Sequence, residues 1–488
     1  MNDPTVTMRQ GLLVLVLLCP WQGCVSESRP GLPPSSPFVE SVGSAGGPLA
    51  QGVAVGDVGS RSALVWFRTD GPARAQVEWF PEGRPDLVER SAVFVTGPDR
   101  DFTMTVPLGK LTAATQYRYR VLVAGPEEAA FQDTAREAGA GRFGTAADPD
   151  RSAPVTFLWS GDLGGQQRCR GERTGYPIFD AMLRKSPAFV LLLGDTIYGD
   201  DRCPSPPNAP GADFFASTLD DYRVKHRYQR GDLFLQQLLA SVPVSAVWDD
   251  HEVGNNFSGP YEPLMPVGRQ ALMEYWPIGA PPEEPTRLYR SLRYGADLEL
   301  FILDTRQYRS RNADPDGPGK TMLGAAQRAW LLEGLARSTA TWKVVATSVP
   351  LSIPKAGNKM APGIDSWARG ADGTGYQTEL RAIVNELMRQ HIRNVVWLAT
   401  DVHFVQVNAY DPDRDGAPDF YEFVCGPLSA APGKPVPPDP ALVPTTLYSE
   451  GGYQNFGLIR LDGQSLHLEI LDDAGRPRFT QTFQKTGS

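Results

Sequence analysis

Short apolar runs recur along the chain, and four of them end abruptly in acidic residues or histidine. They are Val155–Trp159 before Ser160-Gly161-Asp162, Phe189–Leu193 before Gly194-Asp195, Val244–Trp248 before Asp249-Asp250-His251, and Val395–Ala399 before Thr400-Asp401-Val402-His403. Runs rich in Val, Leu and Phe are typical of buried sheet strands. In an open α/β sheet, ligands bind beyond the carboxyl ends of the strands. We therefore expect the four runs to deliver their polar side chains to one edge of a sheet.

An all-β pattern covers residues 38–147. Runs with β-branched and aromatic residues, separated by Gly, Pro and Asp turns, are Ser62–Phe67, Gln76–Phe80, Phe102–Val106, Gln116–Val123 and Gly141–Phe143. Several short strands with turn signals between them are typical of a sandwich of about seven strands. We predict an N-terminal all-β sandwich domain of the fibronectin or immunoglobulin kind.

From residue 148 to residue 488 the pattern alternates between strands and helices. Helices are predicted over Pro177–Lys185, Met322–Arg337 and Thr378–Gln390, and strands over Leu298–Leu303 and Trp342–Ala346. The spacing of apolar residues in Thr378–Gln390 is that of an amphipathic helix. Asp462-Gly463 predicts a hairpin between Phe456–Leu461 and Ser465–Leu471. This alternation predicts a second domain of the α/β class.

The composition indicates a globular chain of more than one domain. The 488 residues are 41% hydrophobic and 21% charged, and a chain of this length exceeds one ordinary core. The net charge of −9 argues against a nucleic-acid coat function. A phosphate substrate stays open, because metal ions can supply local positive charge.

The first 24 residues have the pattern of a signal peptide. Arg9 precedes the apolar run Leu12–Leu18, which is too short to span a bilayer, and Gly23-Cys24 follows it. Gly-Cys after such a run resembles the lipobox of bacterial lipoproteins, in which Cys24 would be lipidated and tether the protein to a membrane. Ordinary cleavage is the alternative. Residues 25–37 are predicted to be a linker. The protein is expected to be exported, as a periplasmic protein, a cell-surface lipoprotein or a secreted protein.

Two cysteines each follow a predicted strand by a few residues. In an oxidising compartment Cys169 and Cys203 could pair and join two loops. The alternative is that both are free thiols. If they pair, Cys425 is left unpaired.

Four strands that deliver Asp, Tyr and His to one place would make a cluster of hard, anionic ligands. Such a cluster repels itself unless a cation neutralises it, so we predict a metal centre, with two metal ions. Glycine before Asp162 and Asp195 lets the backbone turn tightly as it leaves each strand. The carboxylate of Asp195 is suited to bridge two ions. Tyr198 can bind as phenolate, which requires a strongly acidic ion such as Fe(III).

Several strings resemble the PhoD-like (alkaline phosphatase D) metallophosphoesterase family, which is related to the purple acid phosphatases. They are WDDHEVGNN (248–256), GDTIY (194–198), TDVH (400–403), QGVAVGD (51–57), LDTRQYR (303–309) and KTMLGAAQRAWL (320–331). The resemblance implies a metallophosphoesterase-type α/β sandwich after the β domain. It also implies an extracytoplasmic phosphomonoesterase or phosphodiesterase with Fe(III) and Ca²⁺, although Mn, Zn or Mg could take these places.

The chain departs from these relatives at two points. Many family members have a cysteine ligand where this chain has Asp162, so the identity of the metal is open. Purple acid phosphatases need two further histidine motifs, but Ser348-Val349-Pro350-Leu351 contains no histidine. The second metal would therefore have mostly oxygen ligands, which suits Ca²⁺ better than Zn²⁺. Among the remaining histidines, His226 is expected on a solvated helix face.

Roles follow for the residues at the strand ends. One metal would be held by Asp162, Asp195, Tyr198 and His403, and the other by Asp195, Asp250 and Asp401, with Asn255 or Asn256 as a further ligand. A hydroxide held by the metals would attack phosphorus in line. His251 would hydrogen-bond the developing charge or protonate the leaving group. Arg306 would clamp phosphate oxygens, or would pair with Asp304 instead.

A second acidic motif lies further along the chain. Residues 411–422 match the spacing of a twelve-residue calcium loop, with oxygen ligands from Asp411, Asp413, Asp415, Asp419 and Glu422. The preceding strand and the two prolines inside the loop do not suit an EF-hand. Calcium binding at this loop is a hypothesis, and a solvated acidic turn is the alternative.

The sequence thus favours a monomeric, metal-dependent phosphoesterase that acts on a small phosphate ester. Two alternatives stay open. One is a phospholipase D-type enzyme that cleaves lipid headgroups, which would need an apolar rim around the site. The other is a noncatalytic surface binding protein that keeps a metal for stability.

Overall fold

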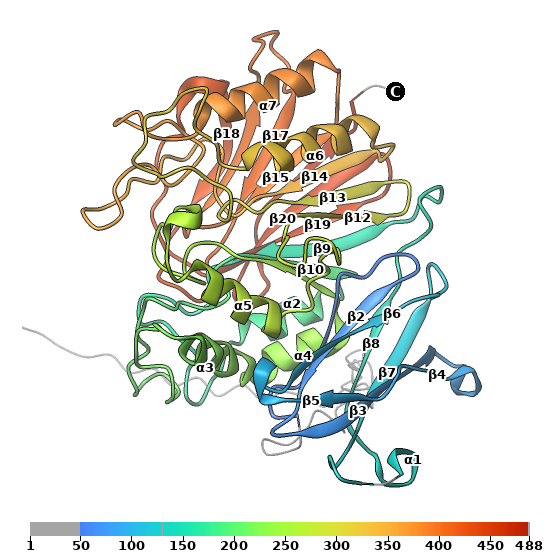
Figure 1. Ribbon diagram of the computed structural model, residues 1–488. Helices are drawn as coiled ribbons and strands as arrows, with labels where there is room; N and C mark the ends of the chain where they lie inside the picture. The colour runs from blue at the N-terminus through green and yellow to red at the C-terminus, as the bar shows by residue number, and fades with distance from the viewer. Residues whose placement is uncertain (1–48, 129, 487–488) are drawn as a thin grey trace, which may run out of the picture. The chain divides into compact units, whose positions relative to one another are not determined.

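The computed structural model describes residues 49–128 and 130–486, which belong to one compact unit. The predicted signal peptide, the linker and Cys24 lie outside these residues. None of the described helices has both the length and the hydropathy that a membrane crossing requires. Three β-sheets and seven α-helices organise the described part of the chain (Figure 1).

The largest sheet has nine strands. In spatial order they are β21 (Pro477–Gln484), β20 (Ser465–Asp472), β19 (Asn455–Leu461), β9 (Val155–Ser160), β10 (Phe189–Leu193), β11 (Val244–Val247), β1 (Val53–Gly56), β2 (Ala63–Arg68) and β6 (Thr103–Leu108). Strands β9, β10 and β11 are parallel neighbours, so their carboxyl ends share one edge. Strands β19 and β20 form the predicted hairpin.

The second sheet has seven strands. In order they are β12 (Arg290–Tyr294), β13 (Leu298–Ile302), β14 (Trp342–Ala346), β15 (Val395–Ala399), β17 (Phe420–Val424), β16 (Val405–Tyr410) and β18 (Pro444–Glu450). Both of its faces are buried, as strand β14 illustrates. Trp342 and Val344 face the core that lies between the two large sheets, whereas Val345 faces a second core with Leu331 and Ile383. Burial on both faces explains why these strands are continuous apolar runs in the sequence.

Helices cover the outer faces of the two sheets. Helices α6 (Gly324–Arg337) and α7 (Gln377–Arg389) lie over the second sheet, and α2 (Ile178–Arg184) and α4 (Leu233–Ser241) pack against the nine-stranded sheet (Figure 1). The remaining helices are α1 (Phe131–Thr134), α3 (Leu219–Arg230) and α5 (Met265–Tyr275). The predicted α/β sandwich is therefore confirmed.

The N-terminal region is an antiparallel β-sandwich, as predicted. A five-stranded sheet of β3 (Ala73–Pro81), β4 (Glu89–Arg90), β5 (Phe94–Thr96), β7 (Gln116–Ala124) and β8 (Arg136–Gly144) packs on β1, β2 and β6. Strand β1 also pairs in parallel with β11, where Gly56 lies opposite Val244. One layer of the β-sandwich therefore continues directly into the nine-stranded sheet.

Two sequence expectations differ from the structure. The four strands that end in polar residues do not share one sheet, because β15 belongs to the second sheet. The two sheets pack face to face, and the Thr400 hydroxyl donates to the Leu193 carbonyl across them at 2.9 Å. The carboxyl ends therefore still meet. The exposed position predicted for His226 is wrong, because its ring is buried and stacks on Tyr275 with centroids 5.1 Å apart.

Candidate metal centre

The predicted ligands lie in tight loops at the carboxyl ends of β9, β10, β11 and β15. Four of them have a left-handed backbone that non-glycine residues rarely adopt. Their φ angles are 63° at Asp162, 51° at Asp195, 75° at Asp401 and 61° at His403. Such a conformation persists only where the surroundings enforce it, and it turns each side chain back towards the strand ends. Local backbone strain thus accompanies the convergence of these side chains.

The first group of ligand atoms comes from Asp162, Asp195 and His403, whose atoms lie within 4.8 Å of one another. His403 Nδ1 lies 2.8 Å from the Ala431 carbonyl, and a carbonyl only accepts, so Nδ1 carries the proton. In the neutral ring the lone pair is then on Nε2, which lies 3.2 Å from the Tyr198 hydroxyl. This arrangement presents a nitrogen lone pair, a phenol and two carboxylates to one point.

The second group comes from Asp249, Asp250 and Asp401, again within 4.8 Å of one another. Asp195 joins the two groups, because its carboxylate also lies within this distance of Asp250 and His251. The predicted bridging position of Asp195 therefore has the geometry it requires. Asp249 is not among the residues that the sequence predicts to bind metal. Its position beside Asp250 in the sequence is the signal that points to it.

Five buried oxygens around these groups have no hydrogen-bond partner within residues 49–128 and 130–486. They are Asp162 Oδ2, Asp249 Oδ2, Asp250 Oδ1, Asn256 Oδ1 and Asp401 Oδ2. A buried polar atom without a partner costs about 1–3 kcal/mol, and more when it is charged. Oxygens and one imidazole nitrogen are ligands that hard cations accept. The residues therefore fit bound metal ions.

The pKa shifts reflect the same crowding. Burial, and then the charge of Asp250 and of other carboxylates, raises the pKa of Asp195 well above its usual range. Burial and the neighbouring carboxylates likewise raise the pKa of Tyr198 well above 10. When carboxylates with raised pKa values are ionised at neutral pH, their repulsion destabilises the folded protein unless a cation binds among them. Binding Tyr198 as phenolate would need a strongly acidic cation.

His251 is held by an aspartate that sequence reasoning misses. Its Nδ1 lies 2.6 Å from Asp200 Oδ1, and its ring stacks on Tyr198 with centroids 4.1 Å apart. The carboxylate fixes Nδ1 as the protonated nitrogen, so Nε2 faces the cluster, 3.9 Å from Asp250. Burial alone lowers the pKa of His251, but Asp250 and Asp200 outweigh it and raise the value to about 9. Asp200 follows Tyr198 by two residues, and no pattern separates it from Asp201.

Buried side chains fix the loops around the ligands. Glu252 accepts the backbone N–H groups of Asp195, Thr196 and Asp249 at 2.7–3.1 Å. Close packing also requires glycine, since a Cβ at Gly165 would lie 2.2 Å from the Tyr198 ring. These contacts hold the loops that follow β10 and β11 against each other, and so fix the geometry of the cluster.

The expectation that Arg306 clamps a substrate phosphate is wrong. Its side chain is fully buried, and it donates to Asp249 at 2.6 Å and to both oxygens of Asp365 at 2.8 Å. Arg306 donates to the Asp304 carboxylate through its backbone N–H and not through its guanidinium, so the alternative side-chain pair with Asp304 does not form either. Arg306 instead neutralises buried carboxylates beside the cluster. Asp365 lies 59 residues further along the chain, which is beyond local sequence reasoning.

The assignment of Asn255 is also corrected. Asn255 is exposed, whereas the neighbouring Asn256 is buried and its Oδ1 is one of the five oxygens without a partner in the described chain. The backbone N–H of Asn256 donates to Asp250 at 2.7 Å. A left-handed turn at Asn256, with φ of 57°, places it inward. Asn256 is therefore the asparagine that belongs to the candidate centre.

The acidic loop forms only in part. Asp411, Asp413 and Asp419 bring oxygens within 4.8 Å of one another, but Glu422 is not among them. Glu422 is buried in β17, where it accepts the backbone N–H of Leu351. Its expected position as the last ligand is wrong, because the strand turns its side chain into the second core. Asp415 lies in the same loop and accepts the N–H of Ala417. Calcium binding there stays a prediction.

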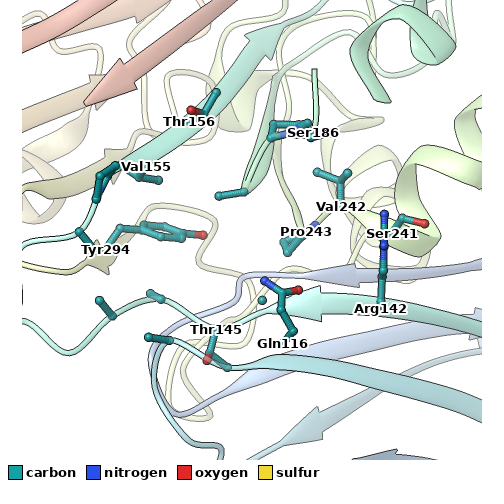
Figure 2. A pocket seen from close by; sticks show the side chains of 18 of the residues that line it. Gln116, Arg142, Thr145, Val155, Thr156, Ser186, Ser241, Val242, Pro243 and Tyr294 are labelled. Carbon is teal, nitrogen blue, oxygen red and sulfur yellow. The ribbon is translucent and has the colours of Figure 1, made fainter. Parts of the chain in front are cut away.

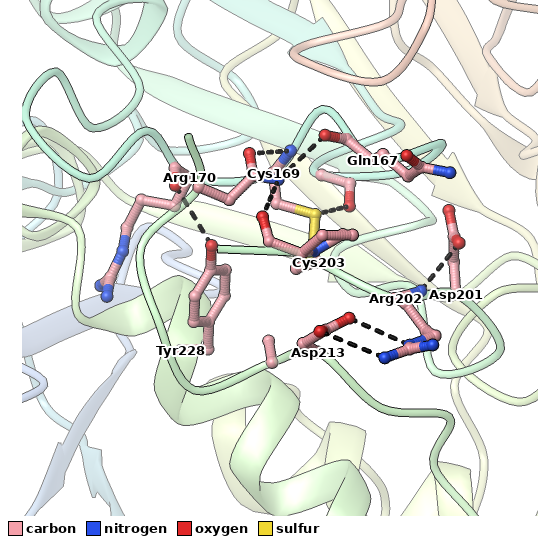
Figure 3. The surroundings of a disulfide bond; sticks show 12 residues. Gln167, Cys169, Arg170, Asp201, Arg202, Cys203, Asp213 and Tyr228 are labelled. Carbon is pink, nitrogen blue, oxygen red and sulfur yellow. Dashed lines mark hydrogen bonds and ion pairs between the residues drawn. A yellow bond between two sulfur atoms is a disulfide. The ribbon is translucent and has the colours of Figure 1, made fainter. Parts of the chain in front are cut away.

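Cys169 and Cys203 form the predicted disulfide, and Cys425 is free and buried (Figure 3). The disulfide joins the loop after β9 to the loop after β10. Figure 3 shows Tyr228 of α3 beside it, with its hydroxyl donating to the Arg170 carbonyl. The loops that carry Asp162 and Asp195 are thus joined covalently.

A cavity of about 590 Å³ lies at the other end of the strands. Val155, Thr156, Pro243 and Tyr294 surround it (Figure 2). Val155 begins β9, and Pro243 precedes β11, so the cavity lies at the amino ends of these strands. The carboxylate cluster follows their carboxyl ends. The candidate site is therefore identified by its cluster of metal-binding side chains and not by the size of a cavity.

Comparison with known proteins gives a consistent result. The family described as "PhoD-like phosphatase" matches residues 163–469, and "PhoD-like phosphatase, N-terminal domain" matches residues 37–147. The chain is 28% identical over 400 residues to "Alkaline phosphatase D" of Bacillus subtilis (strain 168), an alignment that spans 73% of this chain and 64% of that relative.

Two solved structures share the fold. A structure of PhoD has a TM-score of 0.72 at 22% identity and covers 90% of this chain and 93% of its own. A purple acid phosphatase from yellow lupin (Lupinus luteus) seeds has a TM-score of 0.60 at 14% identity, with 88% and 74% covered. At these identities the similarity establishes the architecture.

Proposed function

Because the chain belongs to the PhoD-like phosphatase family, we propose that it hydrolyses phosphate monoesters or diesters with the help of bound metal ions. The observation that carries this proposal is the set of five buried oxygens without a hydrogen-bond partner in the described chain, gathered at the carboxyl ends of the strands. A protein that did not bind cations would leave these oxygens with neither hydrogen bonds nor metal ions to satisfy them.

The residues divide naturally between two cations. Asp162, Asp195, Tyr198 and His403 would hold one ion, which we propose to be Fe(III) because of the phenol. Asp195, Asp250, Asp401 and Asn256 would hold the other, which we propose to be Ca²⁺ because every ligand is an oxygen. When bound, such cations lower the pKa of a water ligand and stabilise charge on phosphoryl oxygens.

The chain itself supplies the proton chemistry. Asp200 accepts from Nδ1 of His251 and so orients the ring with Nε2 towards the cluster. Asp250 and Asp200 raise the pKa of His251, and the part that comes from Asp200 stays when a cation neutralises Asp250. His251 is therefore suited to donate a hydrogen bond or a proton to the leaving oxygen of a substrate. This dyad favours catalysis over the alternative of a noncatalytic protein that keeps metal for stability.

A lipid headgroup is the second candidate substrate. The structure exposes two large apolar side chains on loops that neighbour the cluster in sequence. Phe215, in the segment that follows Asp200, is 61% exposed, and Met360, five residues after Lys355, is 93% exposed. An enzyme that acts on lipids needs apolar groups beside its site, and a phosphatase for small soluble esters does not.

We also propose that the protein acts as a monomer outside the cytoplasm. The disulfide supports an oxidising compartment, because such bonds are rare in the cytosol of mesophiles. The signal-peptide pattern of residues 1–24 points the same way. Incorporation of labelled palmitate would show whether Cys24 is lipidated, and a Cys24→Ser variant should then be unlabelled.

The function is tested by assaying the purified protein on p-nitrophenyl phosphate, bis-p-nitrophenyl phosphate and choline-lipid vesicles. Elemental analysis and a visible spectrum are recorded on the same sample. With iron on Tyr198, a charge-transfer band should appear, and Tyr198→Phe should abolish it. The control is Tyr261→Phe, because Tyr261 is exposed on another loop. Full metal content without hydrolysis of any of the three substrates would contradict the proposal.

A further inference from the structure

Lys355 brings an ammonium group into the second carboxylate group. Its Nζ donates to Oδ1 of Asp401, whose other oxygen has no partner within the described chain. The backbone around Lys355 is fixed, because its carbonyl accepts the N–H of Asp365 at 2.9 Å and its N–H donates to Ser366. The ammonium therefore lies beside Asp401 as a consequence of the loop's own folding.

The two groups of ligands differ in this respect. Asp162 Oδ1 lies 3.4 Å from Nε2 of His403. No lysine or arginine in the described ranges forms an ion pair with Asp162 or Asp195. In the second group, Lys355 pairs with Asp401 and Arg306 pairs with Asp249. Within residues 49–128 and 130–486, lysine and arginine side chains therefore form ion pairs with the second group and with neither Asp162 nor Asp195.

Lys355 and Arg306 differ in their freedom to move. The Arg306 side chain is fully buried and is held by two carboxylates, so its charge is permanent. The Lys355 side chain is 25% exposed, and its ammonium stands at the end of a flexible aliphatic stem, so it has a route to solvent that Arg306 lacks. Of these two side chains, Lys355 is therefore the one suited to displacement.

The sequence after β14 explains why an ammonium has room there. No imidazole occupies this strand end, where Ser348 donates its hydroxyl to Asp249 at 2.6 Å. Seven residues later, Lys355 contributes the positive charge that Asp401 would otherwise lack. A basic side chain therefore lies at the edge of the second group.

We propose that the Lys355 ammonium and the second metal ion compete for Asp401, so that Lys355 sets the metal concentration at which the second site fills. The inference rests on the proposed function, because it assumes that the second group binds a cation. A divalent ion in contact with the Asp401 oxygens and an ammonium on the same carboxylate repel each other. Filling the second site therefore displaces Lys355, whereas the first site fills without displacing any cation of the chain.

The test is a calcium titration by calorimetry on full-length protein that carries Asp411→Ala and Asp413→Ala, so that the surface loop does not contribute, and from which loosely bound calcium has been removed with EGTA. This protein, the reference called wild type in this test, is compared with the same protein carrying Lys355→Met, which keeps the aliphatic bulk and removes the charge. The matched control is Lys359→Met, since Lys359 is exposed on the same loop. We expect Lys355→Met to bind calcium about tenfold more tightly, or better, because a competing partly buried ion pair is gone. Lys359→Met should bind as wild type does.

Thermal melts separate an effect of Lys355→Met on calcium binding from an effect on folding. Without calcium, Lys355→Met should melt at a lower temperature than wild type, because Asp401 loses its counter-charge. With saturating calcium the difference should disappear or reverse. Equal or weaker calcium binding by Lys355→Met overturns the competition while leaving the metal centre intact. If neither protein binds calcium, the proposed second metal site is wrong. The part of the proposed function that depends on that metal ion then fails with it.

Discussion

Two clusters of carboxylates in this protein share the same close spacing and differ in what surrounds them. In the deep group of Asp249, Asp250 and Asp401, and in the surface loop of Asp411, Asp413 and Asp419, three acidic side chains place their oxygens within 4.8 Å of one another. The deep oxygens are buried, and several have no partner in the described chain. In the loop, Asp411 and Asp413 accept backbone N–H groups of Asp415 and Gly416 at 3.1 Å and remain open to water. In the loop, Asp419 Oδ2 is also buried without a hydrogen-bond partner, but the deep cluster gathers five such oxygens. The number of buried oxygens without such partners, and not proximity, therefore marks the functional cluster.

The largest effect is expected when Asp195, the residue at the centre of the deep cluster, is made neutral. Asp195→Asn removes the carboxylate shared by both groups of ligands. We expect phosphoesterase activity to fall about a thousandfold or more, because several kcal/mol of transition-state stabilisation depend on the bound cations. Steady-state kinetics on p-nitrophenyl phosphate check this. Asp413→Asn, the same change in the surface loop, should leave the rate unaltered.

The same variant should be more stable than wild type when both are free of metal. The raised pKa of Asp195 means that its ionised form destabilises the folded protein at neutral pH. A neutral Asn at this position removes that repulsion. Thermal melts in the presence of a strong chelator should show a higher melting temperature for Asp195→Asn. A lower melting temperature for Asp195→Asn would show that repulsion between the ionised carboxylates does not destabilise the folded protein.

Asp200→Asn should produce the next largest effect. His251 would lose the partner that fixes its tautomer and raises its pKa. We expect the rate to fall about 10–100-fold. Because the protonated imidazole is the useful form, activity should decline as pH rises through the pKa of His251, and this alkaline limb should move to lower pH in the variant. A pH–rate profile of both proteins tests this, and an unmoved limb would contradict the role of His251.

The surface loop offers a prediction that concerns calcium alone. If the loop binds calcium, as its spacing predicts, then Asp411→Ala with Asp413→Ala should lose one bound calcium per chain, without loss of activity. Calorimetry on wild type and on the double variant measures this. Unchanged stoichiometry would show that the loop is a solvated acidic turn.

The smallest expected effect is on stability at Asp419. Burial, and then its acidic neighbours, raises the pKa of Asp419 to about 6. Its contribution to stability is therefore fully present below about pH 4 and is lost as pH rises through 6. Asp419→Asn should stabilise the calcium-free protein above pH 6, by less than about 1 kcal/mol because solvent screens the exposed loop. Chemical denaturation at pH 4 and pH 8 tests this, with Asp415→Asn as the control.

Features that depend on local sequence could be predicted. Each buried strand is a short apolar run, and the glycine-aspartate steps after β9 and β10 follow from the tight turns there. The residues Asp162, Asp195, Asp250 and His403 could therefore be named from the amino-acid sequence alone. The β-sandwich and the disulfide also follow from local composition and from the positions of the cysteines.

Features that depend on distant partners could not be predicted. Nothing in the sequence near Arg306 shows that its side chain is paired. In the fold, the distant residue Asp365 accepts hydrogen bonds from the guanidinium, and Arg306 is therefore not available to bind a substrate phosphate. The choice between Asn255 and Asn256 depends on one backbone turn. Glu422 has the correct spacing for a calcium ligand, but strand β17 turns it into the core. Lys355 enters the second group from a loop that has no motif of its own.

The most direct test of the central claim is the metal content of the purified protein, measured by elemental analysis. We predict that wild type and Asp413→Asn hold tightly bound metal ions and that Asp195→Asn loses them. A metal-free wild-type protein that still hydrolyses phosphate esters at full rate, unaffected by chelators or by added ions, would contradict the account.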